Sequence, residues 1–96
     1  MIALALAATL ASASGTHAYR VAVSGPSGSS VVIAAKPPQG WTAAFCSARA
    51  CAVGHVPVKI GAAGTSYVEL HLYPADHPSR GVALVTASGD TLRITL

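Results

Sequence analysis

Acidic side chains are scarce in this chain of 96 residues. Only 9% of the residues are charged, and the carboxylates are Glu69, Asp76 and Asp90. No two of them form a pair along the sequence, which leaves few candidates for acid–base catalysis. The sequence also lacks the G-x-S-x-G motif that positions the nucleophilic serine of many hydrolases. We therefore expect a protein that is not an enzyme and that uses neither catalytic residues nor a cofactor.

Basic side chains are also few, and they form no cluster. A nucleic-acid-binding domain gathers Lys and Arg in a patch or stripe. Here the formal net charge is only +3, and the basic residues stand singly at Arg20, Lys36, Arg49, Lys59, Arg80 and Arg93. No nucleic-acid partner is therefore expected. Hydrophobic residues make up 52% of the chain, which is the opposite of a disordered composition.

The N-terminal segment lacks charge and is apolar. Residues Ile2 to Leu10 are apolar apart from Thr9, a length typical of the hydrophobic region of a signal peptide. Small residues follow at two candidate cleavage sites, which end at Ala13 and Ala18. The apolar run is shorter than the roughly 20 residues that a helix needs to cross a bilayer. The alternative is that this run is the first strand or helix of the domain.

The predicted organisation is an export signal followed by one domain. We predict a signal peptide over residues 1–18, with cleavage near 13 or 18, and a single domain over 19–96. We expect this domain in the periplasm or outside the cell, without stable membrane insertion once the signal is removed. A domain of about 80 residues forms only a marginal core, and such domains often add a covalent staple.

The two cysteines of the chain are the candidates for that staple. Cys46 and Cys51 are separated by four residues, whereas redox-active pairs favour a separation of two. In an exported chain, the pair predicts a disulfide that closes the loop after the Trp41 segment. For so short a loop the chain-entropy model gives a stabilisation of about 2 kcal/mol.

Metal binding is the alternative use of these cysteines, and we predict no metal. A structural zinc site needs two further ligands, for which His55 with His71 or His77 are the candidates. A blue-copper site would use Cys51 and His55 together with an axial methionine, but the only methionine is Met1. A small copper- or zinc-binding, cupredoxin-like protein therefore stays a minor alternative.

Alternation of apolar and polar residues dominates the remaining chain. Short alternating segments bounded by Gly- and Pro-rich turns are typical of an all-β sandwich. The sequence predicts seven strands, over residues 19–23, 30–36, 41–46, 56–60, 65–73, 81–88 and 91–96, the last two as a hairpin. The residues expected in the core are Val21, Val23, Val31, Ile33, Trp41, Phe45, Val58, Ile60, Val68, Leu70, Leu72, Leu84, Leu92 and Ile94.

The clearest alternation lies in residues 65–73. Val68, Leu70 and Leu72 fall on one face, which indicates a strand with one face in the core and one in water. Aromatic rings with polar neighbours can stack on sugars, so a carbohydrate-binding module that uses Tyr67 and Tyr73 is an alternative function. The predicted ligand face is the opposite side of this strand, which carries Tyr67, Glu69, His71 and Tyr73. The other interpretation is an ordinary solvated sheet face, or a face buried against a neighbouring domain.

Several short motifs follow one another in a characteristic order, namely Pro38 to Trp41 with Phe45, Val58 to Ser66, Val68 to Pro74, and Pro78 to Ala87. In this order the chain resembles a known family, the immunoglobulin-like accessory modules of secreted bacterial enzymes and surface proteins, of the NPCBM-associated type. The resemblance covers nearly all of the mature chain. It implies a seven-stranded immunoglobulin-like sandwich with a non-catalytic binding or spacing role, and a protein or polysaccharide as partner.

Overall fold

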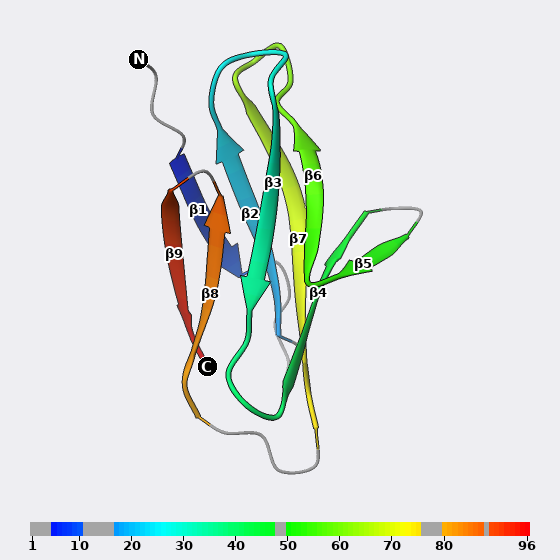
Figure 1. Cartoon of the computed structure of the whole chain (residues 1–96), viewed down its shortest axis with the longest axis vertical. Coiled ribbons are helices and arrows are strands. Elements are labelled where there is room, and N and C mark those ends of the chain that lie inside the picture. The colour runs from blue at the N-terminus through cyan, green and yellow to red at the C-terminus, as the bar shows by residue number, and fades with distance from the viewer. Residues whose placement is uncertain (1–4, 11–16, 48–49, 76–79, 88) are drawn as a thin grey trace.

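The described part of the chain is built of strands. The computed structural model (Figure 1) describes residues 5–10, 17–47, 50–75, 80–87 and 89–96, and none of these lies in a helix. The strands are β1 (Ala5–Leu10), β2 (Ala18–Ser24), β3 (Ser30–Lys36), β4 (Trp41–Cys46), β5 (Cys51–Val53), β6 (His55–Lys59), β7 (Thr65–Pro74), β8 (Val82–Ala87) and β9 (Asp90–Thr95). The seven predicted strands are found with ends within one residue of the predicted ones, and β1 and β5 are additional.

The strands form two antiparallel sheets that pack face to face. The five-stranded sheet has the order β1-β2-β7-β4-β5, and the four-stranded sheet has the order β6-β3-β8-β9. The chain crosses between the two sheets several times. As a result β7 lies between β2 and β4, although it is distant from both of them in the sequence (Figure 1). The predicted all-β sandwich is therefore confirmed, and the β8–β9 hairpin is confirmed with it.

The core lies between the two sheets. It is made of the residues that point inward from each strand, which alternate with residues that point outward. Ile33, Leu70 and Val85 are fully buried there, and Phe45 is its largest completely buried side chain. Ten of the residues predicted for the core are buried, namely Val21, Val23, Val31, Ile33, Phe45, Val58, Ile60, Leu70, Leu72 and Ile94. Three more, Trp41, Val68 and Leu92, are partly buried and pack against this cluster.

The prediction for Leu84 was wrong. In β8 the buried residues are Ala83, Val85 and Ala87, and Leu84 lies on the opposite side of the strand, half-buried. Successive side chains of a strand point to opposite faces, so a shift of one residue exchanges its inner and outer sets. Two of the three inward residues are small alanines. The larger and more hydrophobic Leu84 therefore wrongly indicated which face of the strand is buried.

Trp41 begins β4 and anchors the end of the sandwich opposite the disulfide. The preceding Gly40 has a φ of 88°, a left-handed conformation that glycine adopts without steric cost, and it lets the turn from Pro38 deliver the chain into the strand. The Trp41 indole is half-buried and meets the His17 ring edge-on, with ring centroids 4.8 Å apart. It packs against the core as predicted, and Cys46 lies at the other end of β4.

The segment predicted as a signal peptide contains β1. This strand pairs with β2 from Ala5 opposite Ser24 to Leu10 opposite Tyr19, and forms an edge of the five-stranded sheet. The Leu6 amide also donates a hydrogen bond to the Asp90 carboxylate, at 3.0 Å. The β1–β2 pairing belongs to the uncleaved chain. Cleavage of the signal peptide after export stays a prediction.

Candidate ligand-binding face

The four residues of the predicted ligand face lie together on the outer side of β7. Leu70 and Leu72 are buried between the sheets, so strand alternation turns their neighbours outward. Tyr67 and Tyr73 keep 66% and 50% of their surface exposed. We call this surface the β7 outer face, and define it as Tyr67, Glu69, His71 and Tyr73 with Arg20 of the adjacent strand.

The strands beside β7 carry small residues next to the rings. Ala22 of β2 lies opposite Tyr67, and Ala44 of β4 lies opposite His71. No large side chain therefore stands beside these two rings in the paired positions. Along the strand, Tyr67 and Tyr73 are separated by about 20 Å at the usual rise per residue, so the face is a long strip and not a point.

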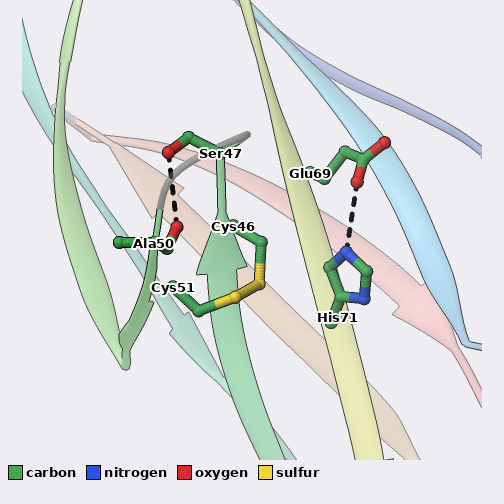
Figure 2. A network of polar contacts seen from close by, with 6 residues as sticks. All are labelled: Cys46, Ser47, Ala50, Cys51, Glu69 and His71. Carbon is green, nitrogen blue, oxygen red and sulfur yellow. Dashed lines mark hydrogen bonds and ion pairs between the residues drawn. A yellow bond between two sulfur atoms is a disulfide. The ribbon is translucent and has the colours of Figure 1, made fainter.

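Contacts within the β7 outer face link its side chains in two groups. The His71 Nε2 atom lies 3.2 Å from Glu69 Oε2 (Figure 2), and the His71 ring stacks on Tyr73 with centroids 6.1 Å apart. At the other end, the Arg20 guanidinium lies 6.0 Å from the centre of the Tyr67 ring, at the limit of a cation–π contact. These contacts hold the polar groups close to the exposed rings.

A surface hollow of about 520 Å³ adjoins the Tyr67 end of this face. It forms where the pairing of β4 with β7 stops, at Cys46 opposite Glu69, while β7 continues toward Thr65. Its lining residues are Arg20, Cys46, Ser47, Tyr67, Val68 and Glu69. Sequence reasoning missed Arg20 as a site residue, although its place between the inward Tyr19 and Val21 already put it on the outer side of the sheet.

One cysteine of the disulfide, Cys46, lines this hollow. Cys46 and Cys51 lie opposite each other in the β4–β5 hairpin, and their sulfur atoms are bonded (Figure 2), so the predicted disulfide is confirmed. Beyond it the Ser47 amide donates to the Ala50 carbonyl, at 2.8 Å. The hairpin projects from the sandwich in Figure 1.

A second, smaller hollow lies under the hairpin. Its volume is about 180 Å³, and it shares Cys46, Ser47 and Val68 with the first. The rest of its lining is Phe45, Ala50, Cys51, Ala52 and Val56, which is mostly apolar. Cys46 thus lines both hollows, of which the first includes the charged side chains of Arg20 and Glu69 and the second is mostly apolar.

The residues considered as metal ligands do not lie together in the structure. The Cys51 sulfur is bonded to Cys46, so the thiolate that a blue-copper site requires is consumed. His55 is exposed at the start of β6, in the four-stranded sheet, whereas His71 lies in the five-stranded sheet, and His77 is outside the described residues. Among the described residues, no three His, Cys, Asp or Glu side chains lie close enough together to hold a metal ion.

The carboxylates are separated as well. Glu69 pairs with His71 on β7, whereas Asp90 lies in the other sheet and accepts hydrogen bonds from the amides of Leu6 and Thr91. Asp76 lies outside the described residues. The two described acids therefore do not share one site.

Comparison with known proteins gives no relative from which a function can be transferred. Neither the family models, nor the curated proteins, nor the solved structures contain a significant match to this chain. Among the described residues there is also no helix of the length and apolar character needed to cross a membrane.

Proposed function

We propose that this protein is a non-catalytic binding module, exported to the periplasm or the cell surface, that holds a carbohydrate chain along the β7 outer face. The observation that carries the proposal is the pair of exposed tyrosines at the two ends of that face, with the Glu69–His71 pair between them. The resemblance to immunoglobulin-like accessory modules and the Cys46–Cys51 disulfide, a bond favoured in oxidising compartments, support export and a binding role.

The chemistry of the face suits a sugar better than the other ligand classes considered. Exposed rings offer flat apolar surfaces to the C–H groups of a sugar ring, while Glu69 and His71 offer hydrogen-bonding groups to its hydroxyls. The extended arrangement of the face, from Tyr67 to Tyr73, matches a linear chain of several sugar rings. The hollow beside Tyr67 would then receive one unit of that chain, with Arg20 as a donor.

Affinity gel electrophoresis on a panel of neutral and acidic polysaccharides tests the proposal. We expect at least one polysaccharide to retard the native protein, and Tyr67→Ala or Tyr73→Ala to abolish the retardation. Val32→Ala is the control, because Val32 is also an exposed apolar residue, at 58%, but lies in the four-stranded sheet. No retardation on any polysaccharide would contradict carbohydrate binding, and equal loss in the Val32→Ala variant would contradict the assignment of the face.

A further inference from the structure

We propose that export and removal of the signal segment convert β2 into a free edge through which two copies of the mature chain form a dimer. This inference rests on the proposed export. In the whole chain, β1 covers the outer edge of β2 along Tyr19 to Ser24. Cleavage at the site ending at Ala13 removes β1 and leaves β2 intact, so a row of backbone donors and acceptors loses its partner.

The alternative cleavage site, which ends at Ala18, would cut into the paired sheet. Ala18 is buried, at 6% exposure, and lies opposite His71 in β7. The preceding carbonyl, of His17, accepts a hydrogen bond from the Leu72 amide at 2.9 Å. Cleavage ending at Ala13 therefore preserves the fold, and a mature chain that begins at Ser14 is expected.

The β2 edge has none of the devices that protect the β5 and β6 edges from pairing. Natural edge strands are kept apart by shortness, proline and lysine. The β5 edge is only three residues long, and the β6 edge carries Pro57 and Lys59. By contrast, β2 has seven residues with no proline and no lysine. Its one charged side chain, Arg20, reaches toward the Tyr67 ring of β7, away from the free edge.

The sequence of β2 is complementary to itself in the antiparallel direction. When Val21 is placed opposite Val21 of a second copy, Tyr19 falls opposite Val23 and Arg20 falls opposite Ala22. The inner residues Tyr19, Val21 and Val23 then meet only inner residues of the other copy, because directly opposed residues of a pair share one face. In the whole chain the place opposite Val23 belongs to Leu6, which packs against the core. Tyr19 of the second copy would take over that apolar position.

Sedimentation velocity of the exported protein tests this inference. The whole frame is expressed in an exporting bacterial host, and the intact mass of the periplasmic protein gives its N-terminus. We expect a chain that begins at Ser14 and a concentration-dependent dimer, whereas the full chain produced without export and then oxidised stays monomeric. A processed chain that is monomeric at every concentration overturns the dimer, and polysaccharide binding by that monomer would show that the proposed function survives. A periplasmic chain that retains residues 5–10 also overturns it, because β1 then still covers the edge.

Two substitutions of one residue distinguish this edge from other modes of association. Ala22→Glu places a carboxylate opposite Arg20 of the second copy and should tighten the dimer, whereas Ala22→Lys places like charges opposite each other and should weaken it. Each change occurs twice in the symmetric pair, so we expect several-fold shifts in the dimer Kd in opposite directions. Thr42→Lys, at an exposed position of the internal strand β4, is the control and should leave the Kd unchanged. Shifts in the same direction for both Ala22 variants would contradict pairing through β2.

Discussion

The two edges of the five-stranded sheet are held in different ways. At the β5 edge, a disulfide joins Cys46 to Cys51, the residues that lie opposite each other in the β4–β5 hairpin. At the β1 edge, pairing with β2 and the hydrogen bond from Leu6 to Asp90 attach the strand. Of the two β1 side chains whose burial the structure describes, Leu6 packs against the core and is half-buried.

This difference indicates that one edge is permanent and the other is separable. The Cys46–Cys51 bond joins the opposed strands β4 and β5. It therefore fixes β5 and the position of Cys46, which lines the hollow beside Tyr67. Because no covalent bond joins β1 to β2, we expect that β1 can be removed while the rest of the sandwich keeps Val21 and Val23 of β2 buried. The proposed export processing would act on the second kind of edge, and ligand binding is expected beside the first.

The largest expected effect comes from β7, on which both edges depend. Leu70 is fully buried and lies opposite Tyr19 in β2 and Phe45 in β4. Leu70→Ala should lower the free energy of unfolding by about 2–5 kcal/mol, measured by urea denaturation. Hydrogen exchange should then show both edges losing protection together. Leu70→Met, which nearly conserves volume, is the control and should cost less than about 1.5 kcal/mol. A loss confined to one edge would contradict the role of β7 as their common support.

Removal of the disulfide should have a local effect at the β5 edge alone. The double substitution Cys46→Ser and Cys51→Ser should lower the free energy of unfolding by about 2 kcal/mol, because the unfolded chain regains the entropy of a short loop. Amides that exchange only through global unfolding should all become faster by the same factor, and any additional loss of protection should be limited to the β4–β5 hairpin. A reductant should reproduce the effect in the native protein and have no effect on the double variant. An additional loss of protection in β1 would show that the two edges are coupled.

The sequence predicted the sandwich well because most strands carry a strong local signal. The alternation in residues 65–73 placed Leu70 and Leu72 inward and Tyr67 and Tyr73 outward, as found. The disulfide followed from compartment and spacing. Both arguments depend on neighbours in sequence, which is why they needed no knowledge of the fold.

The sequence could not show what depends on distant pairing. The strand β5 has only three residues, too few for a visible period, and exists because it pairs with β4. The Arg20 contact with Tyr67 needed the β2–β7 register. In β8, inward alanines carry little hydrophobic signal, so Leu84 was assigned to the wrong face.

At the β1 edge a single substitution should have a smaller effect, and only in the whole chain. Leu6→Ala removes part of a half-buried side chain and should lower the free energy of unfolding of the full chain by about 1 kcal/mol. Asp90→Asn, which weakens the acceptor for the Leu6 amide, should act in the same direction. In the processed chain Leu6 is absent, so the Asp90→Asn effect should shrink there. An equal effect in both forms would show that Asp90 acts through Thr91 and not through β1.

The smallest effect on stability is expected between the edges, on the β7 outer face. Glu69→Gln removes the carboxylate from the exposed pair with His71, in which the Glu69 and His71 side chains are 48% and 30% exposed. Exposed pairs of this kind contribute little, because water screens the charges and the long side chains lose freedom on pairing. We expect a change in the free energy of unfolding within about 0.5 kcal/mol, but weaker retardation by the polysaccharide that binds the native protein. If Glu69→Gln destabilised the fold as much as loss of the disulfide, the face would serve the sandwich and not a ligand.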